Sequence, residues 1–406
     1  MTWRFFGAVS TALVLAAAAC VAAADAPPSV RYVPLDAPAG ASQAVIVDRA
    51  PLAYTRQLLP LDRDGKLVGE GSAEKQSEQV VTNLEAALGA AGSGLNRLVR
   101  VNVCALSHEA ADCDRAQLQK RLAPGVRPAV TTILSPLPHR KALVAVDAVA
   151  VAADKGPAVF LARCDSLAGS PGCADAAVLP PGGTAYLSGQ PERGGLTTAA
   201  VPKSLSALFA TLARLKLSAE HVVQLRVFLT PASSAEETLA QIKPFFPDRP
   251  VPPVVFVEWI ASAPVEIELV ARLPQEDAVA EPLQLYNPPD VRPSPAFSRA
   301  ALVRTPRQIF IAGLSAREAG DGEAQARDVF AQLQQVLAEA GGDLGRLAKA
   351  TYCVSNDDAS SALNKVRSDF LDAERPPAAS KVMVHGVGRA GRTLTVDMIA
   401  VGSRLP

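Results

Sequence analysis

Apolar and polar residues alternate along this chain with the periods of helices and strands, and the whole pattern recurs three times. In the third copy, apolar residues fall at i, i+1, i+4, i+7, i+8 and i+11, a spacing that predicts a helix with one buried face. They are Val329, Phe330, Leu333, Val336, Leu337 and Ala340. The first copy repeats this spacing between Val80 and Ala91, and Gly92 and Gly341 follow the two helices as stop signals.

A strand-like segment marks the same point in each copy and sets the length of the repeat. The three segments recur at intervals of about 125 residues. They are Arg97–Cys104, His221–Phe228 and Arg346–Cys353. A much shorter period would indicate a solenoid, whereas this one matches the size of a domain. The chain is therefore predicted to hold three tandem copies of one globular fold.

Each copy has the same predicted order of elements: two strands, a helix, a strand, a second helix and two final strands. The second helix is predicted over residues 110–122, 235–246 and 359–371. Two helices cover only one face of a sheet, so the fold class is α+β, and the other apolar face needs a partner. We expect the copies to bury these faces against one another around a pseudo-threefold axis, so that a monomer acts as a pseudo-trimer. The predicted repeats span residues 30–153, 157–273 and 283–403.

Composition indicates an ordinary folded protein and limits the classes of partner that we expect it to bind. Nearly half of the residues are apolar, which is enough for buried cores. Lys plus Arg and Asp plus Glu number 40 each, so the formal charge is zero and gives no electrostatic reason to expect nucleic acid or an anionic membrane as a partner. Aromatic residues make up 5%, which also disfavours base stacking.

The first 26 residues have the pattern of a secretory signal peptide. Arg4 precedes an apolar run from Phe5 to Val21, and the small residues 22–24 offer a cleavage site before Asp25. The run is short for a membrane span. We expect an exported protein, periplasmic or extracellular, and Cys20 leaves open a lipoprotein.

Cysteines and histidines give weaker signals. Two local pairs, Cys104 with Cys113 and Cys164 with Cys173, could form disulfides after export, but spacing alone leaves their state open. The alternative for Cys104 and for Cys353, which occupy equivalent strand positions, is a small buried apolar residue. The four histidines show no metal-ligand spacing, so neither a metal nor a cofactor is expected.

An ordered set of short motifs resembles the Rid family, also called the YjgF type. The motifs include YLSGQ at residues 186–190, the pair Arg-Pro before a strand, and VEIELVA at residues 265–271. The resemblance covers all three copies. It implies chorismate-mutase-like α+β domains that assemble as trimers, with a small-molecule site in each cleft between subunits. The best-known activity of the family is hydrolysis of 2-imino or 2-enamine acids to 2-oxo acids and ammonia.

That chemistry needs a carboxylate to activate water, and the resemblance assigns this role to Glu268. Asp147 and Asp397 occupy the equivalent places with a shorter side chain. Among the small residues that line the family's cleft, Ser188 is the one serine, with Thr55 and Ala312 in the other copies. The alternative for the acids is a structural role at a strand end, although a carboxylate between apolar neighbours is costly without a partner.

The chemistry also needs a guanidinium that grips the substrate carboxylate with both nitrogens, and this residue is missing. The strand position that carries it in deaminating members holds Val130, Val254 and Ala379. Arg127, Arg249 and Arg375 stand nearby and are candidate ligand contacts, with loop ion pairs as the alternative.

Three functions follow from these observations. The first in rank is a protein that binds a small metabolite between repeats without standard deaminase chemistry. The second is an imine or enamine deaminase with one working cleft, built on Glu268 and Ser188. The third is an envelope scaffold for protein interactions.

Overall fold

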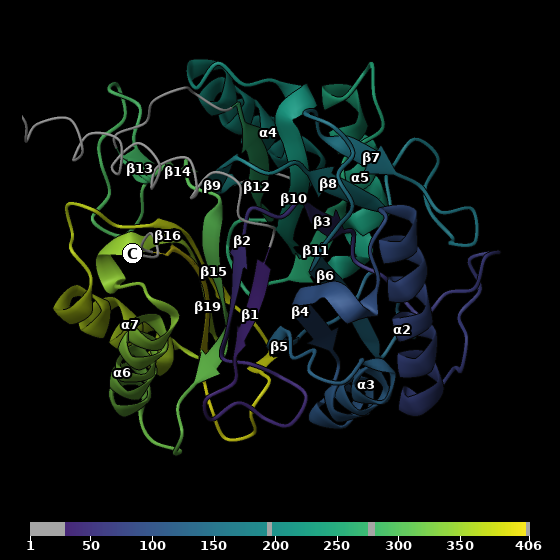
Figure 1. Ribbon diagram of the computed structural model, residues 1–406, viewed down its shortest axis with the longest axis horizontal. Coiled ribbons are helices and arrows are strands. Elements are labelled where there is room, and N and C mark those ends of the chain that lie inside the picture. Colours follow the sequence, from purple (N-terminus) through teal and green to yellow (C-terminus); the bar gives the residue numbers. More distant parts are fainter. Residues whose placement is uncertain (1–28, 193–196, 275–280, 403–406) are drawn as a thin grey trace, which may run out of the picture.

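The computed structural model describes residues 29–192, 197–274 and 281–402. Three pairs of helices form the outside of the molecule, and three sheets meet between them in its centre (Figure 1). The predicted signal peptide and Cys20 lie outside the described residues. Within the described residues, no helix has the length and apolar character needed to cross a membrane.

Each repeat contributes one long and one shorter helix to the outer layer. They are α2 (Ala73–Ala90), α3 (His108–Arg121), α4 (Thr197–Arg214), α5 (Ala235–Ile242), α6 (Gly322–Ala340) and α7 (Asp357–Phe370). Local sequence explains where they begin and end. The carboxylate of Asp321 caps α6 by accepting the backbone N–H of Ala324 at 2.8 Å, and Gly341 ends it in the left-handed conformation. Ser107 and Asn356 cap α3 and α7 in the same way.

The three sheets share one strand order. Each runs hairpin, third strand of a repeat, last strand of that repeat, central strand and then a parallel strand, and the third sheet described below gains a short extra strand. The first sheet consists of β1 (Ser29–Val33), β2 (Ala44–Asp48), β15 (Arg307–Ser315), β19 (Leu394–Val401), β16 (Leu347–Val354) and β17 (Ala378–Met383). The second consists of β13 (Leu283–Tyr286), β14 (Ala300–Val303), β9 (Gly183–Glu192), β12 (Val265–Leu273), β10 (Val222–Leu229) and β11 (Val254–Glu258). The third consists of β7 (Phe160–Ala162), β8 (Ala176–Leu179), β3 (Leu52–Thr55), β6 (Val144–Val151), β4 (Leu98–Ala105), β5 (Ala129–Leu134) and β18 (Gly386–Val387).

Every sheet is completed by a hairpin from another repeat. The first hairpin, β1 and β2, pairs with β15 of the third repeat, where Ile46 lies opposite Ile309. The second hairpin, β7 and β8, pairs with β3 of the first repeat. The third hairpin, β13 and β14, pairs with β9 of the second repeat. The repeat boundaries predicted from the sequence thus mark where the pattern recurs, whereas each sheet draws strands from two repeats. The exchange closes the chain into a ring.

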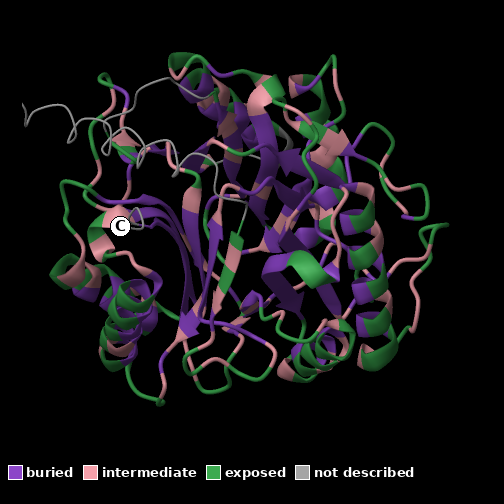
Figure 2. Ribbon diagram, in the orientation of Figure 1, coloured by how far each residue is buried: buried purple, intermediate pink, exposed green. Residues whose placement is uncertain are grey.

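Both faces of each sheet are buried, as the sequence pattern predicted. The helices cover one face of each sheet and form three separate apolar cores. The opposite faces meet in the centre in two further clusters, which combine residues of all three sheets, such as Val99, Val223 and Ala348 in one and Cys104, Phe228 and Cys353 in the other. Figure 2 shows this burial along the central strands and the exposed outer sides of the helices. The α+β pseudo-trimer expected from the sequence is the observed architecture.

The five described cysteines are free thiols, so neither disulfide that the sequence left open is made. Cys104 on β4 points into a central cluster, whereas Cys113 lies on α3, which packs on the other face of that sheet. Cys173 packs in the core of the second repeat, whereas Cys164 contacts that of the first. In each pair the two residues therefore lie in different surroundings, and Cys104 and Cys353 take the buried apolar role.

Candidate functional site

A layer of polar side chains crosses the centre of the molecule between the two central apolar clusters. We call it the axial layer. It consists of Tyr54, Arg100, Asn102, Asp147, Tyr186, Gln224, Arg226, Glu268, Lys349, Thr351 and Asp397. The layer has repeat symmetry, because Arg100, Gln224 and Lys349 occupy equivalent positions on β4, β10 and β16. The three acids that the sequence singled out occupy equivalent positions on β6, β12 and β19.

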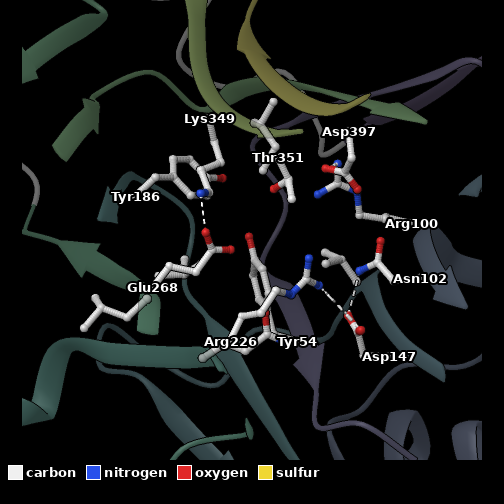
Figure 3. Close-up of a pocket in the computed structure, with 15 residues that line it drawn as sticks. Tyr54, Arg100, Asn102, Asp147, Tyr186, Arg226, Glu268, Lys349, Thr351 and Asp397 are labelled. Carbon is white, nitrogen blue, oxygen red and sulfur yellow. Dashed lines mark hydrogen bonds and ion pairs between the residues drawn. The ribbon is translucent and has the colours of Figure 1, made fainter. Parts of the chain in front are cut away.

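Each acid of the axial layer is paired with a cation from another repeat (Figure 3). Lys349 Nζ lies 2.5 Å from Glu268 Oε2, and Arg226 Nη2 lies 3.2 Å from Asp147 Oδ2. Arg100 pairs with Asp397. A neutral side chain also donates a hydrogen bond to each carboxylate: Ser380 to Glu268 at 2.6 Å, Asn102 to Asp147 at 2.7 Å and Thr131 to Asp397 at 2.8 Å. The three cations balance the three acids.

The second repeat reaches this balance by a different position. Its Gln224 stands where the other repeats have Arg100 and Lys349, and donates to the backbone carbonyl of Thr55 at 2.7 Å. The missing cation comes from Arg226, two residues further along the same strand face. Two substitutions within one repeat therefore leave the charge of the layer unchanged.

The electrostatics of this layer favour a structural role. Burial alone would raise the pKa of Glu268, but Lys349 and Arg226 hold that pKa below its ordinary value. Burial outweighs Arg226 at Asp147 and raises its pKa. The enclosed cavity measures only about 40 Å³, and its unpartnered polar atoms, such as the Tyr54 hydroxyl and Asn102 Oδ1, suit a small number of waters. Glu268 is thus a committed ion-pair partner and a poor base.

This placement corrects the expected location of the predicted acids. We expected Glu268, Asp147 and Asp397 in the clefts between repeats, but they line the axial cavity. Residues two positions apart share one strand face, and that whole face is buried here, so the sequence pattern alone did not identify which of its positions lines the cleft. The cleft-facing residue of the third repeat is Thr395, two positions before Asp397.

A cleft of about 660 Å³ opens between the third and first repeats. We call it the lateral cleft. Residues 36–43 of the first hairpin loop form one wall, and β15 of the third repeat forms another. The strands approach closely behind it, since a Cβ at Gly313 would lie 3.0 Å from Thr131 Cγ2. The strand exchange that closes the ring therefore also builds this cleft.

The buried part of the lateral cleft is uncharged. Its buried lining residues are Ala41, Ser42, Gln43, Ala111, Ala312, Leu314, Gln332 and Thr395, with the partly buried Val130 and Thr132 beside them. The charged lining residues are exposed or half-exposed and stand at the mouth: Asp36, Arg115, Arg317, Glu318 and Arg389. Val130 occupies the position where the resemblance called for a guanidinium, and Thr395 faces the same space without a carboxylate.

The interface between the second and third repeats carries an acid that sequence reasoning missed. Glu266 lies two positions before Glu268, and its carboxylate packs so closely on Gly189 that a Cβ there would lie 1.8 Å from Oε1. Burial raises the pKa of Glu266 to about 7. The alternation within VEIELVA contained the signal, because Glu266 and Glu268 share one strand face. Ser188 lies nearby on β9, and its hydroxyl accepts the N–H of Ala379 at 2.9 Å and donates to the carbonyl of Ser298.

The three predicted ligand-binding arginines lie away from both cavities. Arg127 and Arg375 are exposed, and Arg249 donates to the backbone carbonyl of Ala219 at 2.9 Å. None of the three lines the axial cavity or the lateral cleft. Over the described ranges, no group of three or more His, Cys, Asp or Glu side chains is arranged to hold a metal ion.

Comparison with known proteins places this fold in a family. The sequence profile of the family described as Endoribonuclease L-PSP matches residues 35–152 and 290–401, more than half of the chain. The chain belongs to this family. The resemblance to Rid proteins that the motifs indicated is thereby confirmed, and the two matched segments support the tandem repeats. A comparison with curated proteins found no match.

Solved structures of Rid-type proteins resemble single repeats of this Rid-family chain. NMB1025 of Neisseria meningitidis, a YjgF-family protein, is 20% identical and aligns over 30% of this chain and 97% of its own, with a TM-score of 0.24. The Rid-family protein YyfB of Yersinia pestis is 20% identical over 30% of this chain and 98% of its own, with a TM-score of 0.26. RidA of a Psychrobacter species is 24% identical over 23% of this chain and 80% of its own, with a TM-score of 0.21.

Proposed function

We propose that this Rid-family chain binds a small metabolite in the lateral cleft and does not hydrolyse 2-imino acids there. The observation that carries the proposal is the uncharged interior of that cleft. Hydrolysis of an imino acid requires a cation that binds the substrate carboxylate and a carboxylate that activates the attacking water. Val130 and Thr395 occupy the positions where these two groups would face the ligand. The cleft volume of about 660 Å³ suits a metabolite.

The axial acids do not restore the missing chemistry. Glu268, Asp147 and Asp397 each hold an ion pair, and removing any of them from its partner would leave a buried charge. They line the axial cavity, and none of them lines the lateral cleft. Their role is to join the repeats.

The test is a direct assay for ammonia. Freshly generated 2-iminopropionate is mixed with the protein, and ammonia release is compared with release in buffer alone. We expect equal rates, together with metabolites that raise the melting temperature without being consumed. Ammonia release that Thr395→Val or Val130→Trp reduces would contradict the proposal, because these substitutions change only the lateral cleft.

One observation favours a second function, an imine deaminase between the second and third repeats. Glu266 has a pKa near 7, which suits a residue that both takes and gives a proton, and it lies in the same interface as Ser188. Ala379 offers no guanidinium there, so substrate binding would need another cation. If this function exists, Glu266→Gln abolishes ammonia release while ligand binding in the lateral cleft persists.

A further inference from the structure

We propose that a phosphate group, free or carried by a small metabolite, binds where α7 covers β17, the last strand of the first sheet. Four side chains of the third repeat form this site: Ser360, Asn364 and Arg367 of α7 and Lys381 of β17. We call it the α7 site. None of the four lines the lateral cleft or the axial cavity, so the site is additional to the function proposed above and does not depend on it.

The four side chains come together on one side of the sheet. Ser360, Asn364 and Arg367 are spaced i, i+4 and i+7 and therefore share one face of α7. Lys381 reaches this face, since its Nζ donates to Ser360 Oγ at 3.0 Å and to Asn364 Oδ1 at 3.2 Å. Arg367 Cζ lies 5.6 Å from the ring centroid of Tyr352, which pairs with Lys381 on the neighbouring strand. Because paired residues point to the same face of a sheet, the two cations lie close together under α7.

These two cations have no negative partner in the part of the chain that the structure describes. Neither Arg367 nor Lys381 forms an ion pair there, and both are half-buried. Burial and the nearby charge of Arg367 both lower the pKa of Lys381. Holding two like charges together and partly out of water costs free energy that a bound anion would offset. A phosphate monoester carries about 1.5 to 2 negative charges at pH 7, which matches the two positive charges.

The hydrogen bonds of Lys381 leave further donors free for the same anion. Lys381 bonds to the oxygens of Ser360 and Asn364, so the hydroxyl hydrogen of the serine and the amide N–H groups of the asparagine remain available. Asn364 is exposed, and α7 lies on the outside of the molecule (Figure 1), so a ligand can approach from solvent. Ammonium, guanidinium, hydroxyl and amide donors on two elements suit a tetrahedral phosphate better than a planar carboxylate, which favours two parallel donors.

The other two repeats have no comparable cluster. The residues equivalent to Arg367 and Lys381 are uncharged in both: Leu118 and Thr132 in the first repeat, Ile242 and Phe256 in the second. Leu118 and Ile242 are buried in the cores under their helices. The fold of a repeat therefore does not need these two charges, which favours a ligand as the reason for them.

The experiment titrates the full chain with inorganic phosphate and with glycerol 3-phosphate at constant ionic strength, by isothermal calorimetry. We expect saturable binding of at least one, and about tenfold weaker binding of acetate. Lys381→Thr and Arg367→Leu introduce the residues of the first repeat, and each should weaken phosphate binding by about tenfold or more. The tighter of the two phosphate probes shows whether the site takes free phosphate or a phosphorylated metabolite.

The matched control is Lys365→Thr. Lys365 lies on α7 but is exposed and bonds to Glu323, so its loss removes one positive charge from the same helix outside the site and should leave binding unchanged. No saturable binding of either phosphate probe overturns the inference. Acetate binding as tightly as phosphate overturns it as well, and so does an equal loss of affinity in Lys365→Thr, which would indicate unspecific attraction.

Melting curves separate a ligand site from a purely structural role of the two cations. Without phosphate, Arg367→Leu should melt at the same temperature as the unmodified chain or higher, because it removes a half-buried charge. It should lose only the rise in melting temperature that phosphate causes. A lower melting temperature without phosphate, together with unchanged phosphate binding, would show that the charges serve the fold and would overturn the inference. Metabolite binding in the lateral cleft stands or falls separately.

Discussion

Equivalent buried positions in the outer helices hold residues of different polarity in the three repeats. Asp114 lies in α3 with both carboxylate oxygens buried and unpartnered, and burial raises its pKa to about 7. The equivalent residues are Thr238 in α5 and the fully buried Leu363 in α7. The first repeat thus keeps an acid where the third has an apolar residue.

We predict that Asp114→Leu stabilises the protein, and more so as the pH rises. Between pH 3.8, the ordinary pKa, and about pH 7 the folded state keeps a proton on Asp114 that the unfolded state has lost. The free energy of unfolding therefore falls through this window, by on the order of 4 kcal/mol in total. Urea unfolding at pH 4 and pH 8 should show a small gain for the variant at pH 4 and a large one at pH 8. Asp112→Leu on the exposed side of α3 is the control, and an equal gain at both pH values would refute the explanation.

Two equivalent serines, Ser42 and Ser298, should respond oppositely to the same substitution. Ser298→Ala removes a buried hydrogen bond and leaves the Pro376 carbonyl without this donor, so we expect a loss of about 1 kcal/mol. Ser42→Ala removes a hydroxyl that has no partner, so stability should be unchanged or slightly higher. Chemical denaturation of both variants checks this, and an equal loss in the two would mean that Ser42 is satisfied in the free protein.

At the scale of elements, the strands carry ion pairs that join one repeat to another. Lys349 on β16 and Glu268 on β12 form such a pair, and both side chains are buried. Buried pairs of this kind specify which surfaces meet, but add little stability over an apolar replacement of equal size. Each interface between repeats has one such pair.

A double-mutant cycle tests this role. Lys349→Met strands a buried carboxylate, and we expect a loss of 3–5 kcal/mol, roughly the cost of breaking such pairs. Lys349→Met combined with Glu268→Leu should recover most of that loss. Because the pKa of Glu268 is lowered, the contribution of the pair is present above the ordinary value of 4.5 and lost as the pH falls below it. A double variant as unstable as the sum of the two single variants would contradict a replaceable pair.

The strand exchange is also testable at this scale. Ile46 on β2 lies opposite Ile309 on β15, a spacing that suits a disulfide. We predict that Ile46→Cys with Ile309→Cys forms a disulfide within one chain, detected by peptide mapping after oxidation. Ile46→Cys with Ala53→Cys is the control, since those residues would meet only if the first hairpin paired with β3 of its own repeat. A link in the control alone would exclude the exchange.

The sequence predicted which segments form helices and strands better than it predicted which strands pair with one another. The period identified three repeats, and capped helices such as α6 follow the expected apolar spacing. It did not predict the exchange, because three residues between β2 and β3 can lead the chain into its own sheet or a neighbouring one. It also placed Glu268 in a cleft, because positions two residues apart share one strand face and the pattern does not tell which of them faces the cleft.

At the scale of the whole molecule, one chain performs the assembly that Rid proteins, by the resemblance, reach with three. Covalent linkage allows each repeat to diverge, and two of the interfaces differ: the buried part of the lateral cleft is uncharged, whereas the interface between the second and third repeats carries the buried Glu266. In the described part of the chain, each sheet takes its hairpin from within the same chain. We therefore predict a monomer in solution.

The mass of the protein in solution tests this account most directly. Sedimentation equilibrium over a range of concentrations should give the mass of a single chain, at most 42.2 kDa and independent of concentration. A mass three times larger, or one that rises with concentration, would show that the repeats complete their sheets and clefts between chains and would contradict the closed pseudo-trimer.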